Sequence, residues 1–122
     1  MGVKSYQELK IWQNGIELTI QVYKFTENLP PKEKFGLISQ MQRASVSVPA
    51  NIAEGWSRSY TKEFIQFLRI SLGSLAELET MIILCQKLNY CEAQDENAIR
   101  GRIGELQKMI YATIKTLSSR LS

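Results

Sequence analysis

Apolar residues recur at alternating intervals of three and four along most of the chain, and this spacing restricts the fold more than any other feature of the sequence. It places apolar side chains on one face of an α-helix, whereas a half-buried strand needs an interval of two. No segment shows the alternation typical of a strand, so the sequence predicts an all-α fold. In the longest apolar segment the stripe is Phe64, Leu68, Ser71, Leu75, Leu78, Ile82 and Cys85.

Prolines, glycines and polar residues divide the chain into four helical segments. We expect helices over about 6–28, 32–55, 61–88 and 96–120. Pro30 and Pro31 end the first segment, and Gly55 suits the C-terminal cap of the second. Long helices with short connections and this apolar spacing are typical of an antiparallel up-down four-helix bundle. We therefore predict a single four-helix-bundle domain over residues 1–122.

The first predicted helix carries more apolar surface than one core requires. A helix that is apolar most of the way round is buried on two sides. We therefore expect the bundle to self-associate into a homo-oligomer, with another copy covering the second side. One stripe is Ile11, Gly15, Leu18, Val22, Phe25 and Leu29, and the other is Leu9, Trp12, Ile16, Thr19 and Tyr23.

The stretch SVSVPANIAEG, residues 45–55, places a proline inside the second predicted helix. Pro49 has no N–H for the carbonyl of Ser45, and a helix continues through such a site with a kink if neighbours satisfy that carbonyl. The hydroxyls of Ser45 and Ser47 are close by in the sequence. Alternatively, the helix ends at Val48 and restarts with Pro49 in its first turn. The apolar stripe keeps its phase across Pro49, which favours the continuous helix.

The opposite side of this segment carries polar residues at the same helical spacing. They form either a solvated face with a few ion pairs or a polar stripe buried at a subunit boundary, where Asn51 and Glu54 fix the register. Catalysis by Glu54 has little support, because one carboxylate without a partner is no catalytic motif. The polar residues are Gln40, Arg43, Ser47, Asn51, Glu54 and Arg58.

Composition excludes several classes of enzyme. The chain has no histidine, which removes Ser-His-Asp and Cys-His nucleophile systems and the common zinc sites. It also lacks a glycine-rich phosphate loop and any cysteine spacing typical of metal sites. Cys85 and Cys91 are too few for a disulfide framework. We expect no catalytic residues, no metal and no cofactor. We also expect a cytoplasmic protein without a membrane segment, because no secretory segment or long apolar run is present.

Three quoted stretches carry a resemblance to a known family. They are SYQELKIWQNGIEL at residues 5–18, SVPANIAEGWSR at 47–58 and KEFIQFLRISLGSLAELET at 62–80. They resemble the four-helix-bundle proteins encoded within intervening sequences of 23S ribosomal RNA. The first stretch fits the family's start, L-x-x-W-x-x-A-x-x-L, with Gly15 where alanine is common. The resemblance covers nearly the whole chain.

The resemblance implies a bundle assembled into a homopentameric ring, with no established enzyme activity. A related branch serves as the accessory factor of diversity-generating retroelements, where a basic pentamer engages nucleic acid and a reverse transcriptase. We interpret the matching positions as residues that specify the bundle and its assembly. Gly73 in mid-helix costs about 1 kcal/mol relative to alanine, and close helix approach is expected to offset this cost. The matching positions are Pro49, Asn51, Glu54 and Gly55 in one signature and Phe64, Gly73, Ser74, Glu77 and Leu78 in the other.

A second feature points to nucleic acid as a partner. The chain's net charge is +3, yet from residue 98 onward five basic residues face a single acid, Glu105. In a ring, a positive face would repeat on every subunit and follow an RNA or DNA phosphate backbone. The other interpretation is a solvated basic helix end, where cations complement the helix dipole. The candidate nucleic-acid-binding residues are Arg100, Arg102, Lys108, Tyr111 and Lys115.

Two further interpretations remain at this point. The oligomer would act as a scaffold for a partner protein, with Trp56, Tyr60 or Tyr90 as candidate anchors. Alternatively, residues around the second connection would form a DNA-reading helix-turn-helix. The helix that follows is too long and too apolar for a recognition helix, which disfavours the helix-turn-helix.

Overall fold

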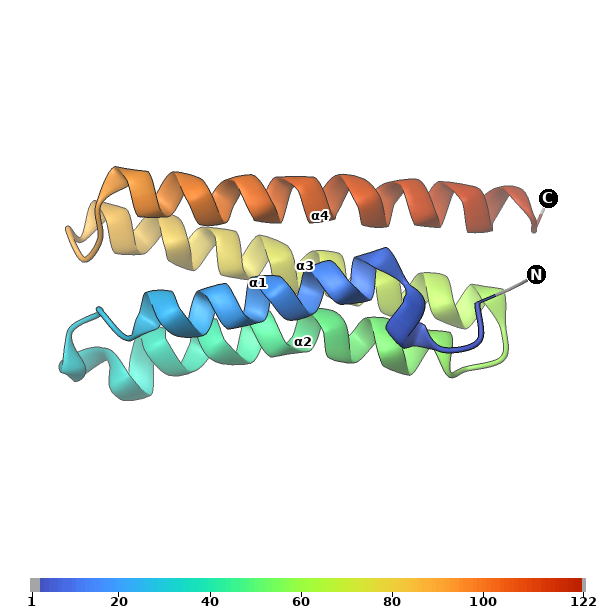
Figure 1. The fold of residues 1–122 in the computed structure, drawn as a ribbon, viewed down its shortest axis with the longest axis horizontal. Coiled ribbons are helices and arrows are strands. Elements are labelled where there is room, and N and C mark those ends of the chain that lie inside the picture. Colours follow the sequence, from blue (N-terminus) through green and yellow to red (C-terminus); the bar gives the residue numbers. More distant parts are fainter. Residues whose placement is uncertain (1–2, 122) are drawn as a thin grey trace.

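The computed structural model describes residues 3–121, and within that range it contains four α-helices and no strand. The helices lie side by side, and Figure 1 shows the connections between successive helices at alternating ends of the molecule. The predicted all-α fold is confirmed. The helices are α1 (Lys10–Thr26), α2 (Ser39–Trp56), α3 (Thr61–Lys87) and α4 (Ala93–Ser119). None of these four combines the length and the apolar character needed to cross a bilayer.

Two helices begin later than the sequence predicts, because the backbone leaves the helical conformation before each of them. Before α1, Tyr6–Glu8 form a 3-10 turn and Leu9 is extended, with φ −73° and ψ 129°. Before α2, Pro31–Glu33 form a second 3-10 turn. The π-type turn Lys34–Ile38 follows, in which Gly36 has non-helical angles of φ −108° and ψ −112°. Each predicted segment is therefore a short turn followed by the α-helix.

The fourth helix begins three residues earlier than predicted, after a tight connection from α3. Asn89 adopts the left-handed conformation, with φ 62°, and Glu92 is extended, with ψ 150°. Asp95 and Glu96 then occupy the first turn of α4, where carboxylates favour the positive end of the helix dipole. α3 and α4 each have 27 residues and are roughly 40 Å long.

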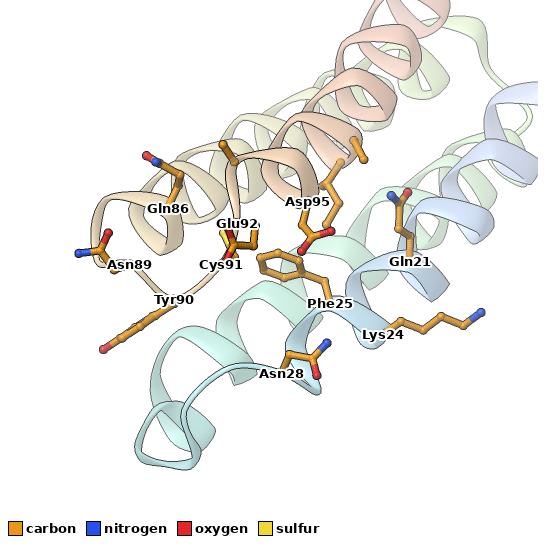
Figure 2. Close-up of a pocket in the computed structure, with 13 residues that line it drawn as sticks. Gln21, Lys24, Phe25, Asn28, Gln86, Asn89, Tyr90, Cys91, Glu92 and Asp95 are labelled. Carbon is orange, nitrogen blue, oxygen red and sulfur yellow. The ribbon is translucent and has the colours of Figure 1, made fainter.

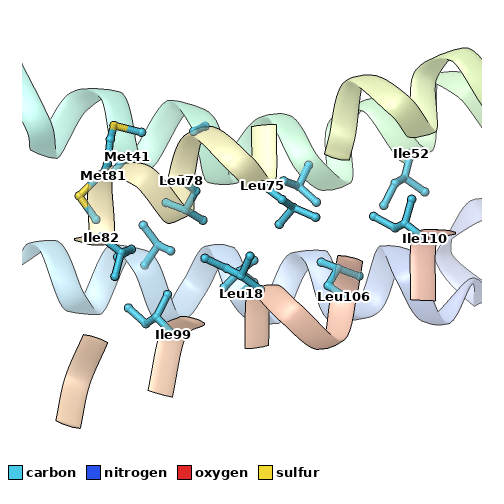
Figure 3. Close-up of a cluster of buried hydrophobic side chains, with 14 of the residues drawn as sticks. Leu18, Met41, Ile52, Leu75, Leu78, Met81, Ile82, Ile99, Leu106 and Ile110 are labelled. Carbon is cyan, nitrogen blue, oxygen red and sulfur yellow. The ribbon is translucent and has the colours of Figure 1, made fainter. Parts of the chain in front are cut away.

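The hydrophobic core runs along the bundle and receives side chains from all four helices (Figure 3). Full burial of one such side chain contributes roughly 1.5–3 kcal/mol. In α1 the first predicted apolar stripe supplies the fully buried residues, among them Leu18 and Val22, whereas the second is divided: Trp12 packs against the core and Tyr23 is 43% exposed. Core residues drawn in Figure 3 include Leu18, Met41, Ile52, Leu75, Leu78, Ile82, Ile99, Leu106 and Ile110.

α2 continues through Pro49, as the phase of the apolar stripe predicted. The carbonyl of Ser45, which has no helical donor opposite the proline, is satisfied from another helix. Thr19 of α1 places its Oγ1 2.9 Å from that carbonyl oxygen, and the same hydroxyl lies 2.9 Å from the carbonyl of Gly15. The two neighbouring helices are thus tied together at the proline.

The expectation that nearby serines supply this hydrogen bond is wrong. The Ser45 hydroxyl donates back to the Gln42 carbonyl at 2.8 Å, and the Ser47 hydroxyl pairs with that of Ser74 on α3 at 2.8 Å. A serine in a helix reaches carbonyls three or four residues before it. The Ser45 carbonyl is therefore outside the reach of both serines.

Gly15 allows α1 to approach α2 at the proline. A Cβ atom at Gly15 would lie 3.2 Å from Cβ of Pro49 and 3.4 Å from its Cδ. Distances this short require the neighbouring atoms to move. Gly15, Thr19 and Pro49 therefore form one packing unit between α1 and α2.

Candidate interaction surfaces

Packing inside the chain accounts for two residues of the first signature, Pro49 and Gly55. Pro49 is buried against Gly15. A Cβ atom at Gly55 would lie 2.6 Å from Cβ of Phe67 and 3.1 Å from Cδ1 of Phe64, so α3 occupies the space that a side chain would need. Both residues therefore lie where α2 packs closely against α1 and α3.

Asn51 and the serines beside it form a short hydrogen-bond chain between α2 and α3. The Asn51 amide donates to the carbonyl of Ser47 at 2.8 Å and to its hydroxyl at 2.9 Å. The Ser47 hydroxyl in turn pairs with Ser74, which is 7% exposed. Asn51 and Ser47 are half-buried in the single chain. This part of the polar stripe is therefore ordered by contacts within the bundle.

Glu54 and Arg58 lie further along the same stripe and are exposed. The Glu54 carboxylate accepts from Nε of Arg58 at 2.9 Å, and Arg58 also pairs with Glu63 at 3.5 Å. The guanidinium of Arg58 lies 5.0 Å from the ring centroid of Phe67. Exposed ion pairs contribute little to stability. An exposed, ion-paired carboxylate has neither the burial nor the cleft that a catalytic acid or base requires.

Gly73 and Glu77 are exposed on the outer side of α3. Close helix approach at Gly73 does not occur within the single chain, because a Cβ atom there would have no atom of the described residues within 4 Å. Since Ser47 contacts Ser74, the residues beside them lie at the same level of the bundle. We call this surface the α2–α3 face: Ser47, Asn51, Ile70, Gly73 and Glu77. A groove of about 360 Å³ continues it, lined by Gln40, Arg43, Ala44, Ser47, Glu77 and Met81.

A second exposed surface lies on the outer side of α1 and α2. Ile20 is 52% exposed, and Tyr23 and Val46 are each 43% exposed. Thr19 contacts Ser45, so their neighbours Ile20 and Val46 lie level with each other. We call this surface the α1–α2 face: Ile20, Tyr23 and Val46. It includes part of the second apolar stripe predicted in the first helix.

Two of the five candidate nucleic-acid-binding residues are paired with carboxylates inside the chain. Arg100 lies 3.3 Å from Glu96 and 3.7 Å from Glu79 of α3. Arg102 lies 3.3 Å from Glu17 of α1. The two arginines therefore reach toward different neighbouring helices, and both have acidic partners that compete with a phosphate. Glu96 lies four residues before Arg100 on α4, so helical spacing predicts that pair, whereas Glu79 and Glu17 come from α3 and α1 and could not be found this way.

The other three candidates lie further along α4 and are exposed. Lys108, Tyr111 and Lys115 are three and four residues apart, so they share one side of the helix. Tyr111 is 58% exposed. Within residues 3–121 neither lysine has an ion pair. We call this surface the α4 basic face: Lys108, Tyr111 and Lys115.

The three candidate aromatic anchors differ in their surroundings. Tyr60 is 70% exposed, as an anchor for a partner protein would be. Trp56 is half-buried, and its ring lies edge-on to Tyr6 with the centroids 6.4 Å apart. Tyr90 is also half-buried and donates its hydroxyl to the Glu33 carboxylate at 3.1 Å. Of the three, Tyr60 is the one whose ring is largely open to a partner.

A cleft of about 760 Å³ lies at one end of the bundle, between α1 and the connection from α3 to α4 (Figure 2). Sequence reasoning missed it, because its walls come from the ends of three separate segments. Cys91 lines it, and burial, with Glu96, Asp95 and Glu92 nearby, raises the pKa of that thiol. Cys85 lies deeper, 3.8 Å from Sδ of Met41, and burial raises its pKa to about 11. Both thiols are therefore protonated and poorly nucleophilic at neutral pH.

No group of three or more histidine, cysteine or acidic side chains in the described part of the chain is arranged to hold a metal ion. What the bundle offers instead is surface: two exposed faces beside α2, a basic face on α4 and the end cleft. The fold therefore defines an all-α, four-helix protein whose candidate sites are interaction surfaces.

Comparison with known proteins places this fold in a family. The model of the 23S rRNA-intervening sequence protein family matches residues 7–112, so the chain belongs to that family. The resemblance inferred from the quoted stretches is confirmed. A search of curated proteins found no significant match.

A solved structure has the same fold. It is the crystal structure of a protein of unknown function from the S23 ribosomal protein family of Bacteroides thetaiotaomicron. The TM-score is 0.77 with 25% sequence identity, and the alignment covers 86% of this chain and 98% of that one. Membership of the family therefore gives the architecture, and function has to be argued from the surfaces.

Proposed function

We propose that this chain is a non-enzymatic subunit of a cytoplasmic homo-oligomer, an up-down four-helix bundle that assembles into a ring, with the five copies that the family resemblance implies. The observation that carries this proposal is the pair of exposed faces on either side of α2. Ile20 and Tyr23 on one face, and Ile70 on the other, leave apolar surface in water although the core is complete. Clustered exposed apolar residues, as on the α1–α2 face, mark interaction sites.

The two faces suit a ring because they differ. A ring requires a heterologous contact, in which one surface of each subunit meets a different surface of the next. The α1–α2 face is apolar, whereas the α2–α3 face combines Ile70 with polar groups and the exposed Gly73. A glycine without a side chain lets an apolar side chain from the next subunit approach the α3 backbone. Such a contact between subunits would offset the unfavourable helix propensity of Gly73. No contact within the described chain does so.

The assembly is tested by measuring the mass of the purified protein with native mass spectrometry and light scattering. We expect a single oligomer with five copies at micromolar concentration. Tyr23→Lys and Gly73→Leu should each give monomers. Tyr111→Lys and Gly101→Leu are the matched controls, because both positions are exposed and lie outside the two faces; these variants should assemble normally. A wild-type protein that is monomeric at every concentration would contradict the proposal.

A second candidate function is nucleic-acid binding by the assembled ring. The α4 basic face supports it, because Lys108 and Lys115 have no ion pair in the described chain and Tyr111 offers an exposed ring between them. Lysines bind phosphates by releasing counterions, and an aromatic ring stacks on an unpaired base. Repetition of this face around the ring would add avidity.

Binding is tested by titrating labelled structured RNA and a DNA duplex across salt concentrations. We expect Lys108→Ala with Lys115→Ala to weaken binding and to flatten the dependence on salt, by about one in the logarithmic slope for each phosphate that is no longer neutralised. Arg100→Ala with Arg102→Ala removes the same charge from α4 and should have the smaller effect, because these arginines already have acidic partners. Lack of saturable binding at low salt would leave the protein-binding scaffold, with Tyr60 as an anchor, as the better function.

A further inference from the structure

The groove on the α2–α3 face has the size and the lining to receive one side chain. Its volume of about 360 Å³ is at the small end of the range for binding pockets. Ala44 and Met81, which are 5% and 7% exposed, form its apolar floor. The rest of the lining is polar and less buried: Gln40, Arg43, Ser47 and Glu77.

Two charged residues of this groove have no partner inside the chain. Arg43 of α2 and Glu77 of α3 are both exposed, and within residues 3–121 neither side chain forms an ion pair or a hydrogen bond. Arg43 can only donate hydrogen bonds, and the carboxylate of Glu77 can only accept them. The groove therefore offers a donor and an acceptor together. A hydroxyl group matches this pair, because it both donates and accepts.

Tyr23 on the α1–α2 face carries such a hydroxyl on an aromatic ring. Its side chain is 43% exposed, and its hydroxyl has no hydrogen bond in the described part of the chain. An aromatic ring packs well against the sulfur of a methionine, and Met81 is in the floor of the groove. Tyr23 thus has an apolar part and a polar end that both suit the α2–α3 groove.

Tyr23 also lies at the same height along the bundle as the groove. The side chain of Thr19 contacts the Ser45 carbonyl, and Gln42 donates to the hydroxyl of Thr26 at 3.1 Å. Tyr23 lies between these two contacts on α1, so it is level with the turn of α2 between them. That turn of α2 also lines the groove.

Equal heights matter because one rotation axis relates the subunits of a closed ring. With the bundles standing along that axis, Tyr23 of one subunit faces the groove of the next. The same register brings Ile20 opposite Gly73, because they lie at the heights of Val46 and Ser47, respectively. A single arrangement therefore supplies an occupant for the groove and an apolar side chain for the exposed glycine.

On the basis of the proposed ring, we infer that Tyr23 of each subunit inserts into the α2–α3 groove of the next. Its ring lies against Ala44 and Met81. Its hydroxyl donates to the carboxylate of Glu77 and accepts from the guanidinium of Arg43. This contact fixes the register between neighbouring subunits and orients them head to tail.

Disulfide capture in the full chain tests this register. Tyr23→Cys with Glu77→Cys puts thiols on two different faces, so mild oxidation should link subunits into covalent species up to the size of the wild-type oligomer. Tyr23→Cys with Ile70→Cys is the matched control. Ile70 is on the same face, about 10 Å further along α3, and a disulfide joins Cα atoms no more than about 7 Å apart. This control should not form the ladder. Each new cysteine alone measures any background from Cys85 and Cys91.

Charge exchange tests the lining of the groove. Tyr23→Lys puts an ammonium beside Arg43 and should give monomers, whereas adding Arg43→Glu should restore the oligomer. Arg69→Glu makes the same change of charge at an exposed position of α3 outside the face and should not restore it. Tyr23→Phe keeps the ring and should weaken association about tenfold, because the hydroxyl is lost. Tyr111→Phe should have no effect.

The outcomes separate this inference from the ring itself. An oligomeric wild type in which the Ile70 pair is captured as readily as the Glu77 pair would overturn the insertion of Tyr23 and leave the ring in place. Equal rescue by Arg69→Glu and Arg43→Glu would do the same. Capture that stops at a covalent dimer would contradict the head-to-tail order. A wild type that is monomeric at every concentration would overturn both proposals.

Discussion

The hydroxyl of Thr19 lies 2.9 Å from the carbonyl oxygen of Ser45, the one carbonyl of α2 that Pro49 deprives of its helical donor. A threonine on a different helix thus completes the hydrogen bonding of a proline-containing helix. Because Gly15 lies one turn before Thr19 and its missing side chain leaves room for Pro49, the same turn of α1 both accepts the proline ring and supplies the missing donor. This relationship leads to the first two predictions.

Thr19→Val should destabilise the bundle by about 1–3 kcal/mol, since it leaves the Ser45 carbonyl buried and unpaired. Ser71→Ala is the matched control. The Ser71 hydroxyl also crosses between helices, to the Val48 carbonyl at 2.9 Å, but that carbonyl keeps the N–H of Ile52 as its helical donor. Urea unfolding of both variants measures the difference. Equal decreases in stability would show that the proline is irrelevant to the role of Thr19.

Pro49→Ala should make Thr19 less important, because alanine returns an N–H to the Ser45 carbonyl. In a double-mutant cycle, the cost of Thr19→Val should therefore be smaller with alanine at position 49 than with proline, by about 0.5–1.5 kcal/mol. Unfolding free energies of the four proteins give this coupling. Strict additivity would contradict the interpretation that Thr19 replaces the missing donor.

Gly55→Ala should destabilise the fold by about 1–3 kcal/mol, because the new Cβ would lie 2.6 Å from Cβ of Phe67, close to the α3 backbone. Gly101→Ala makes the same substitution where no atom lies within 4 Å. It should stabilise α4 by about 0.5–1 kcal/mol through helix propensity alone. Thermal and urea unfolding of the two variants should show changes of opposite sign. Stabilisation by Gly55→Ala would mean that α3 moves away at little cost.

Stability should fall as the pH rises through the range in which Cys85 titrates. Its pKa is 9.0 in an ordinary environment and about 11 in the fold, so between these values the folded state binds more protons than the unfolded state. The free energy of unfolding then decreases as the pH rises, by up to about 3 kcal/mol in total. Below about pH 9 the thiol is protonated in both states, and its full contribution to stability is present.

This dependence is measured by urea unfolding at several pH values from about 8 to about 11, in wild type and in Cys85→Ala. The contribution of the Cys85 thiol is the difference between the two curves. The variant should be less stable at neutral pH and should show the shallower decline. Parallel curves would indicate that the buried thiol does not resist ionisation.

The spacing of apolar residues was enough to predict the helices and most of the core. Leu68, Leu75, Leu78 and Ile82 share one face of α3 because they are three, four and seven residues apart, and all four are buried. The phase of the stripe across Pro49 also predicted a continuous α2. These inferences succeeded because they depend on local geometry, which repeats along a helix. The start of α2 was misplaced because a single non-helical glycine, Gly36, leaves no periodic signal.

The sites depended on contacts between helices, and local geometry could not predict them. Arg100 and Arg102 were predicted to bind nucleic acid, but α3 and α1 supply Glu79 and Glu17 as carboxylate partners that the sequence did not predict. Gly73 was expected to permit close helix approach, and within the single chain no helix lies close to it.

By itself, then, the sequence determined an all-α chain of four amphipathic segments and its family. The tertiary structure alone decided which carbonyl accepts a hydrogen bond from Thr19, which charged side chains have no ion pair, and that Gln21 lines the cleft at the end of the bundle. Each of these depends on which residues from distant segments come to lie at the same level of the bundle. That level is set by the packing of whole helices against one another, and no short stretch of sequence encodes it.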